Sequence, residues 1–390
     1  MASSSRNLSF RLITEQSAMF SIAGDWSRLL AKSSDPRPML DPRWMLGWWR
    51  QYGAGVELAV GVLFDGERPV GLAPLCIRNY HYGPGLVFRR LQFMGVDVDE
   101  WDGICSMYMG FISLPGYEAD VIEDFIGRIT AGEFGMWHEV MLGPMRSEFP
   151  LSAQAKSLFE KSGLRCEQKR RTVNYYVKLR STWDEYLQSL PSGQRTRIHD
   201  ALIDFERWAS QNGGWKLEYA TAGEALEKGF STLLGLQHDR SSPRFIAFQH
   251  DYIASSADSQ NIEIACLKVG NVPVAVVYGI RDGKEILVYH YGGAVQKPNQ
   301  TNIGLVMNAL LIQKAIAHGD EGVDFLSGGF GFDEDLATDQ RPIVSLRIAR
   351  PTWREAVRVG GIRARDAVRS AVRTLYGRPV DRPALTSPQR

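Results

Sequence analysis

The order of hydrophobic and polar positions predicts a mixed α/β protein whose two halves share one plan. In the first half, apolar residues at helical spacing follow the Asp41-Pro42 pair, and an alternating segment with a turn at residues 65–68 indicates a β-hairpin. In the second half a hairpin returns with its turn at Gly270-Asn271. A strand, a helix and a further strand follow in both halves. No residue-level repeat accompanies this order, so the duplication is predicted for the structure alone.

Individual elements are predicted from the same periodicities and from turn and capping residues. Helices are expected at residues 10–50 in two pieces, 117–130, 152–162, 183–211 with a break near Pro191, 230–240 and 302–318. Strands are expected at 57–64, 69–77, 91–94, 104–107, 139–143, 175–179, 263–269, 273–281, 285–291 and 322–326. Trp44, Trp48 and Trp49 have helical spacing and are expected in the core.

Composition separates a basic tail from an acidic body. The 390 residues are 44% hydrophobic and 23% charged, and the net charge of +1 predicts no nucleic-acid partner. From Arg350 to Arg390 there are ten Arg, no Lys and three acidic residues, a charge of +7, whereas the preceding 349 residues carry −6. Apolar residues recur at helical spacing from Trp353 onward, between arginines. We expect this basic amphipathic helix to pack on the acidic body, with weak contact to an anionic membrane surface as the alternative.

Four cysteines stand far apart and form no Cys-x-x-Cys pair. Their spacing predicts neither a disulfide framework nor a zinc site, so we expect reduced thiols in a cytoplasmic protein without a bound metal. The longest uncharged apolar stretches, 104–114 and 272–280, are shorter than the roughly 18 residues that suggest a membrane span. No integral membrane segment is therefore expected.

The segment 286–304 is the clearest candidate for a ligand site. A predicted strand ends at Gly292-Gly293, and after a loop a helix opens at Thr301-Asn302-Ile303-Gly304. Free backbone N–H groups and the dipole at a helix N-terminus suit a pyrophosphate. Thr301 or Asn302 can cap the helix, and Gly304 would let phosphate oxygens approach the backbone. Spacing alone favours the simpler interpretation of a capped helix after a turn.

Several segments together resemble one known family. They are Pro38–Trp44, Pro69–Leu75, Leu91–Gly95 leading to Trp101-Asp102, Leu236–Arg240, Tyr291–Gly304, Ala315–Gly319 and Asp324–Leu326. In the order and spacing of these segments the chain resembles the CelD/BcsL-type acetyltransferases of the GNAT superfamily, which are related to the Fem aminoacyl ligases. The resemblance covers nearly the whole chain.

This resemblance implies an α/β fold of two tandem GNAT-like (acyl-CoA N-acyltransferase) domains, each a mixed, mainly antiparallel sheet flanked by helices. A non-catalytic domain is expected at 1–174, a GNAT domain with the acyl-CoA site at 175–350, and the basic helix and tail at 351–390. Acetyl-CoA or another acyl-CoA would bind through Tyr291, Gly292, Gly293 and residues 301–304. Its thioester would lie between the strands at 286–291 and 323–326, where backbone amides can stabilise an oxyanion.

Candidates for proton transfer and acceptor binding are few. Alternation along residues 286–291 puts Val288 and His290 on one face, and His290, at the strand end, is the best-placed general base. Asp333 is the second candidate. The plain alternatives are a strand-end histidine bonded to backbone and a solvated loop carboxylate. Candidate acceptor-binding residues are Asp102, His238 and Arg240, for which a turn aspartate and helix-end capping are the alternatives.

One departure from the family concerns the segment after Asp324–Leu326. Relatives usually show a Tyr-Lys pair followed by Trp, and here Phe332, Asp333 and Leu336 stand at those positions. The local charge is therefore reversed, which favours either a cationic or neutral acceptor or a loss of activity.

Acyl transfer to an amine or to a sugar acceptor in exopolysaccharide or other biosynthesis is the leading functional hypothesis. A Fem-like aminoacyltransferase and a catalytically silent GNAT-like scaffold protein are the alternatives.

Overall fold

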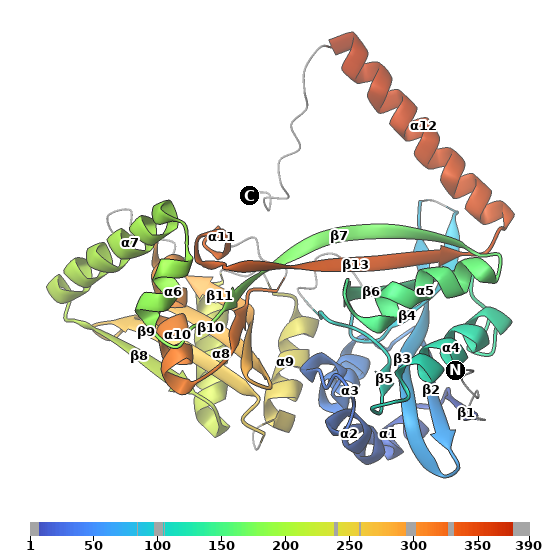
Figure 1. Ribbon diagram of the computed structural model, residues 1–390, viewed down its shortest axis with the longest axis horizontal. Helices are drawn as coiled ribbons and strands as arrows, with labels where there is room; N and C mark the ends of the chain where they lie inside the picture. The colour runs from blue at the N-terminus through green and yellow to red at the C-terminus, as the bar shows by residue number, and fades with distance from the viewer. Residues whose placement is uncertain are drawn as a thin grey trace.

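The computed structural model describes residues 8–83, 85–96, 104, 106–237, 241–256, 259–293, 302–326 and 331–376, and these residues form one continuous mixed sheet flanked by helices (Figure 1). The first half contains β1 (Ser9–Ile13), α1 (Gln16–Ser21), α2 (Ala23–Ala31), α3 (Pro42–Tyr52), β2 (Glu57–Asp65), β3 (Arg68–His81), β4 (Val87–Phe93), β5 (Ile112–Ser113), α4 (Glu118–Ala131), β6 (Glu139–Arg146) and α5 (Pro150–Lys161). β7 (Arg165–Lys178) leads to α6 (Trp183–Ser189), α7 (Ser192–Gln211), β8 (Trp215–Ala220), α8 (Gly223–Leu236), α9 (Pro243–Ser256), β9 (Ile262–Val269), β10 (Val272–Asp282), β11 (Glu285–Gly293), α10 (Ile303–His318), β12 (Gly322–Asp324), α11 (Asp333–Leu336), β13 (Asp339–Ala349) and α12 (Trp353–Tyr376).

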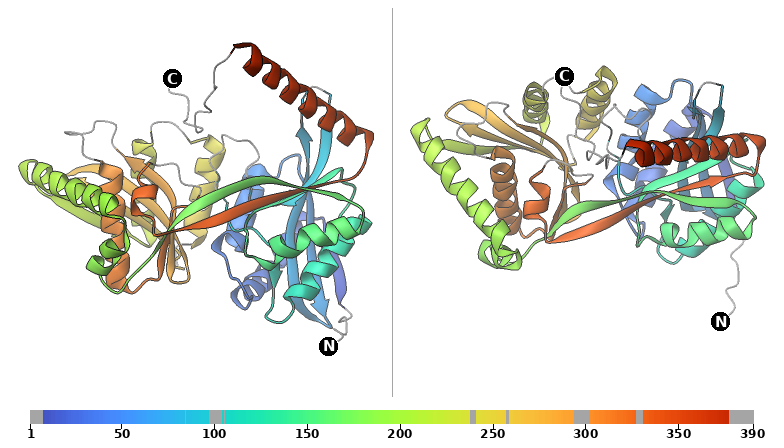
Figure 2. Two further views of the ribbon diagram at one scale, coloured as in Figure 1. Left: turned by 45° about the horizontal axis from the view of Figure 1, so that its top comes forward. Right: turned by 90° about the horizontal axis from the view of Figure 1, so that it is seen from above.

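Two long antiparallel strands, β7 and β13, join the halves (Figures 1 and 2). The strand order is β1-β2-β3-β4-β6-β13-β7-β12-β11-β10-β9-β8, with β5 paired to β3. β13 pairs with β6 of the first half over residues 343–349, and β7 pairs with β12 of the second half over residues 176–178. The chain therefore returns to the first half after completing the second. The domain limits at 174 and 350 stay a prediction.

Each half has one parallel strand pair at its centre. β4 pairs with β6 over residues 90–92 and 139–141, and β11 pairs with β12 over residues 285–287 and 322–324. The other pairings among the described residues are antiparallel. A hairpin precedes the parallel pair in each half, and a helix, α4 or α10, lies between its two strands in the sequence. The expected duplication of structure is therefore present.

The hydrophobic core forms two clusters, and they lie on opposite faces of the sheet in the second half. One cluster includes the first half together with α8 and α9, and the second lies between α6, α7, α10 and the opposite face of β9–β11. Trp44 is fully buried, and its ring centroid lies 4.8 Å from Phe248 and 5.4 Å from Tyr289, so α3 packs directly on the second half. The core positions of Trp44, Trp48 and Trp49 are confirmed.

Several sequence predictions are wrong in detail. Residues 10–13 belong to β1 where a helix was expected, and the described residues of 104–107 form no strand. The sequence patterns also did not predict β8, α9 and β13. The strand predicted at residues 175–179 starts ten residues after the true start of β7. β7 and β13 are rich in charged and polar residues. Some of their side chains contact the neighbouring strand, some face solvent, and others are buried in the core. A hydrophobic pattern therefore does not mark them.

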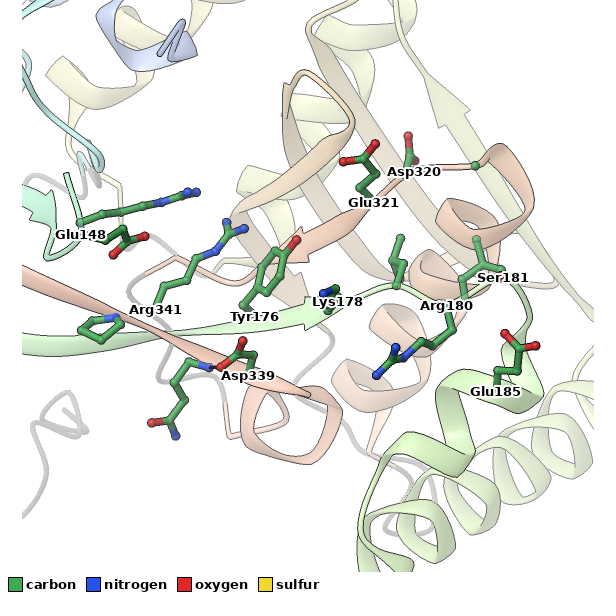
Figure 3. A pocket seen from close by; sticks show the side chains of 16 residues that line it. Glu148, Tyr176, Lys178, Arg180, Ser181, Glu185, Asp320, Glu321, Asp339 and Arg341 are labelled. Atoms are coloured by element: carbon green, nitrogen blue, oxygen red, sulfur yellow. Dashed lines mark hydrogen bonds between the residues drawn. The ribbon is translucent and has the colours of Figure 1, made fainter. Parts of the chain in front are cut away.

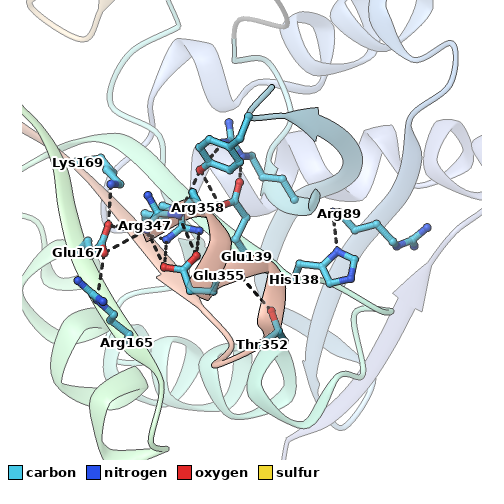
Figure 4. Close-up of polar contacts among 12 residues, drawn as sticks. Arg89, His138, Glu139, Arg165, Glu167, Lys169, Arg347, Thr352, Glu355 and Arg358 are labelled. Carbon is cyan, nitrogen blue, oxygen red and sulfur yellow. Dashed lines mark hydrogen bonds and ion pairs between the residues drawn. The ribbon is translucent and has the colours of Figure 1, made fainter. Parts of the chain in front are cut away.

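The basic tail begins as α12, and its first two turns are held by buried charges (Figure 4). Glu355 accepts hydrogen bonds from Arg347 at 2.6 and 3.0 Å and from Arg358 at 2.7 Å. Burial raises the pKa of Glu355, but the hydrogen bonds from Arg358 and Arg347 outweigh it and lower the pKa to about 2. Trp353 is 62% exposed and Val357 53% exposed. The expected packing of the tail on the body is therefore present at the start of α12, where ion pairs hold it, while Trp353 and Val357 stay exposed.

Within the part of the chain that the structure describes, no helix is both long and apolar enough to cross a membrane.

Candidate functional site

The strands β11 and β12 separate in the middle of the second half. They pair only over three residues, and β11 then continues to Gly293 with β10 as its neighbour. Beyond Leu287, the other edge of β11 therefore has no paired strand among the described residues. An edge of this kind offers backbone amides and carbonyls to a ligand.

The helix α10 begins beside this opening with free backbone donors. Asn302 is its N-cap, and the Asn302 side chain accepts a hydrogen bond of 3.2 Å from the N–H of Leu305. The N–H groups of Ile303 and Gly304 have no acceptor among the described residues. The helix ends at Gly319, whose φ of 83° allows the left-handed C-cap. The predicted cap and both ends of this helix are confirmed, and its free donors at the start suit an anion.

The glycines near this opening are required by packing. A Cβ on Gly304 would lie 2.5 Å from a ring carbon of Phe332, and one on Gly293 would contact the Tyr291 hydroxyl. A Cβ on Gly292 would lie 3.1 Å from Leu233 of α8. The side of Gly304 is therefore covered by Phe332.

His290 lies on a different face from the one predicted. The β10–β11 register shifts between Tyr278 and Gly279, which pair with His290 and Val288, so β11 carries an extra residue there. Such a bulge interrupts the alternation of side chains. The His290 ring lies 4.9 Å from Phe245 of α9, while Val288 packs in the cluster around α10. The expectation that Val288 and His290 share a face is therefore wrong.

The surroundings of His290 fit a positioned imidazole. Its Nδ1 lies 3.5 Å from the side-chain nitrogen of Gln237, which also donates to the carbonyl of Tyr291 at 3.2 Å. The Tyr289 ring lies 4.4 Å away, nearly perpendicular. The ring is thus held at the strand end, between β11 and the end of α8, next to the opening.

The acidic run 333–335 is engaged by the chain itself. Asp333 is 1% exposed and accepts a hydrogen bond of 3.1 Å from the N–H of Gly331, so it is not a solvated loop carboxylate. Glu334 accepts from the Tyr175 hydroxyl, and this hydrogen bond raises the pKa of Tyr175 to about 12. Asp335 pairs with Arg197 at 2.5 Å. These contacts oppose the idea that the run attracts a cationic acceptor.

Four predicted site residues, Thr301, Asp102, His238 and Arg240, lie outside the described residues. The remaining predicted cofactor residues, Tyr291, Gly292, Gly293, Asn302, Ile303 and Gly304, come together around the end of β11 and the start of α10. Burial raises the pKa of Tyr291 to about 12, so its hydroxyl stays protonated.

A buried polar hub that the sequence patterns do not predict is centred on Asp324. This carboxylate is fully buried at the end of β12 and accepts from the Tyr108 hydroxyl at 2.5 Å and from Arg341 at 2.7 Å. Its other oxygen accepts from the N–H of Leu326 at 2.8 Å, which holds Leu326 at a φ of 50°. Asp324 therefore fixes the turn by which the chain leaves β12 at the opening.

Tyr108 brings the first half into this hub. Its hydroxyl also accepts a hydrogen bond of 2.8 Å from Asn174. Burial and the charge of Asp324 raise the pKa of Tyr108, so the hydroxyl is a fixed donor. Asp324 belongs to a segment that the family resemblance had marked, but no sequence pattern marked Tyr108.

A separate cleft of about 1050 Å³ lies at the opposite end of α10 (Figure 3). Ile316 and Gly319 at the end of that helix line it, with Tyr176 of β7 and Arg341 of β13. The 16 residues of α10 separate this cleft from the free donors at the helix start by about 24 Å. Among the described residues no group of three His, Cys, Asp or Glu could hold a metal ion.

Comparisons with known proteins agree with this geometry. Residues 197–334 match the acetyltransferase (GNAT) domain family, and this range contains β8–β12, α10 and the opening between β11 and β12. No curated protein matches the sequence.

Solved structures share the fold at low sequence identity. FemX is 10% identical, with a TM-score of 0.52 over 87% of this chain and 96% of FemX. The C-terminal domain of a putative lysylphosphatidylglycerol synthetase from Agrobacterium fabrum is 11% identical, with a TM-score of 0.50 over 88% of this chain and 95% of that domain. A conserved protein of unknown function from Bacteroides thetaiotaomicron is 10% identical, with a TM-score of 0.50 over 88% of this chain and 100% of that one. These likenesses show the fold alone, and they confirm the expected mixed α/β architecture.

Proposed function

Residues 197–334 of this chain belong to the acetyltransferase (GNAT) domain family, and from this premise we propose that the protein transfers an acyl group from acetyl-CoA or another acyl-CoA to an amine or hydroxyl acceptor. One observation carries the proposal: the edge of β11 that has no paired strand among the described residues lies beside the start of α10, where backbone N–H groups are free. The first offers hydrogen bonds to a thioester and the second to a pyrophosphate.

Each part of the site has a role in this proposal. Bound acyl-CoA would supply an activated thioester. The N–H groups of Ile303 and Gly304 would bind phosphate oxygens, and Asn302 keeps the first turn of α10 in place. Backbone N–H groups on the free edge of β11 would stabilise negative charge on the carbonyl oxygen as the acceptor attacks.

His290 would accept the proton that the acceptor nitrogen or oxygen loses on attack. The new bond joins the acceptor to the carbonyl carbon, the carbon–sulfur bond breaks, and CoA leaves as a thiolate that takes up a proton. Gln237 and Phe245 hold the imidazole in position, and His290 would take up the proton at the ring nitrogen that carries none. We assign Asp333 to holding the Gly331 turn, because its carboxylate is buried there.

The acceptor is a small molecule or sugar in this proposal, and exopolysaccharide assembly is one setting suggested by the family resemblance. A catalytically silent scaffold protein is the second candidate. It is favoured by the acidic run, whose carboxylates are held by Gly331, Tyr175 and Arg197 where relatives carry a Tyr-Lys pair.

The charge at the start of α10 tests the proposal. Asn302→Asp keeps an N-cap acceptor and should preserve the helix, but it places a negative charge beside the proposed pyrophosphate. We expect acetyl-CoA affinity, measured by calorimetry, to fall at least about tenfold, because two charges about 4 Å apart at a protein surface repel by a few kcal/mol.

The matched control is Thr182→Asp, which makes the same charge change at the N-cap of α6, where the Thr182 side chain accepts from Glu185 N–H at 3.2 Å. This control should bind acetyl-CoA like the wild type. Equal affinity of the Asn302→Asp protein and this control would rule out the proposed phosphate position. Absence of binding to the wild type would favour the scaffold.

A further inference from the structure

The cleft at the C-terminal end of α10 is lined by a buried arginine, two of whose nitrogen atoms have no acceptor among the described residues. Arg146, at the end of β6, lines the cleft and is 8% exposed. Its Nε and Nη2 atoms have no hydrogen-bond acceptor among the described residues. A guanidinium has five N–H donors, and leaving them unpaired in a buried place costs free energy.

The neighbours of Arg146 hold it in place without satisfying its donors. Its guanidinium stacks on Tyr108 at 4.2 Å from the ring centroid, and its Nη2 lies 3.6 Å from Glu285, which is an ion pair without a hydrogen bond. Glu285 already accepts hydrogen bonds from Arg341 at 2.5 and 2.8 Å and from the Tyr176 hydroxyl at 2.9 Å. The carboxylate next to Arg146 is therefore committed to other donors.

The rest of the lining limits the ligand. Lys178 and Arg180, at the end of β7, are exposed and have no ion-pair partner among the described residues (Figure 3). Exposed carboxylates of Glu148, Glu185, Glu321 and Asp339 stand along the same cleft. Mixed charges at the rim oppose a polyanion, while the buried cation favours one anionic group.

We propose that this cleft is a second ligand site, in which Arg146 binds the carboxylate or phosphate group of a small hydrophilic molecule. A planar guanidinium binds either group through two parallel N–H donors. The site does not depend on acyl transfer, because it lies at the other end of α10 from the proposed pyrophosphate position.

Calorimetric titrations with inorganic phosphate and with succinate, at constant ionic strength, test the proposal. Phosphate would also be attracted to the start of α10, so both titrations use the Asn302→Asp protein as well as the wild type. We expect saturable binding of at least one probe in both proteins. Preference for phosphate identifies a phosphate ester as the ligand class, and preference for succinate a carboxylate.

Arg146→Gln should weaken this binding at least tenfold, and Arg146→Lys should weaken it less. Glu285 keeps Arg341 and Tyr176 in both variants, which favours folding. The control Arg207→Gln removes an exposed arginine whose one ion-pair partner among the described residues is Asp204 in α7, and it should bind like the wild type. Acetyl-CoA affinity should be unchanged in Arg146→Gln, which separates this site from the proposed acyl-CoA site.

Hydrogen exchange of the wild type supplies an answer even where the variants do not fold. The bound probe should protect residues 176–180 and 339–342. Binding of neither probe, equal binding to Arg146→Gln, or protection confined to other segments would overturn the proposal.

Discussion

Tyr108→Phe removes one hydroxyl from the contact by which the first half reaches the opening in the second. That hydroxyl donates to Asp324 at 2.5 Å and accepts from Asn174 at 2.8 Å. Phenylalanine keeps the ring on which Arg146 stacks. Asp324 retains Arg341 and the N–H of Leu326, so the change takes away one of three donors from a buried carboxylate.

The expected loss follows from the kind of hydrogen bond. A bond to a charged group contributes about 1.5–3 kcal/mol, and the Asn174 amide is also left without this acceptor. We therefore expect the free energy of unfolding to fall by about 2 kcal/mol. Because Asp324 also positions Leu326 at the opening, the affinity for acetyl-CoA should fall as well.

Urea unfolding followed by circular dichroism measures the first effect and calorimetry the second. Tyr80→Phe is the matched control, because the Tyr80 hydroxyl makes no hydrogen bond with the described residues while its ring lies 3.3 Å from the Arg90 guanidinium. A difference between the two variants below about 0.5 kcal/mol, the size of an ordinary surface change, would refute the role given to this contact.

Three further outcomes are expected. His290→Gln should lower turnover by about 10²-fold or more with unchanged acetyl-CoA affinity, and normal turnover from pH 6 to 9 would remove His290 from the mechanism. Gly304→Val should destabilise the protein by about 1–3 kcal/mol, because its Cβ would lie 2.5 Å from Phe332, and Phe332→Ala should recover part of that loss in a double-mutant cycle. The pKa of Glu355 is lowered from 4.5 to about 2, so its contribution to stability is present above pH 4.5 and is lost as the pH falls towards 2. Acid should therefore lower the melting temperature of the wild type more than that of Glu355→Gln. Equal dependence of the two melting temperatures on pH would contradict the ion-pair anchor of α12.

Local signals explain which parts of this fold could be predicted. The cap at Asn302, the apolar run of α10 and Gly319 lie within one helix, so the sequence marks both of its ends. The two hairpins have short turns and alternating strands, and both are present. Elements of this kind are set by interactions between near neighbours in the chain.

The hub at Asp324 could not be predicted in this way. Tyr108 and Asp324 are 216 residues apart, and their contact depends on how the halves pack. The bulge in β11 is similar, because it is defined by the register with β10 and reverses the face of His290 without any change in composition. Packing also explains why a glycine is needed at position 304, since Phe332, 28 residues further along the chain, covers it.

The stoichiometry of acetyl-CoA binding tests the central claim most directly. Both halves contain a parallel strand pair, but only the second combines it with the matched GNAT family range. Calorimetric titration of the full chain should therefore give one site per molecule, lost or strongly weakened by Asn302→Asp. No saturable binding, or one site of unchanged affinity in the Asn302→Asp protein, would contradict the assignment of acyl-CoA to the opening between β11 and β12.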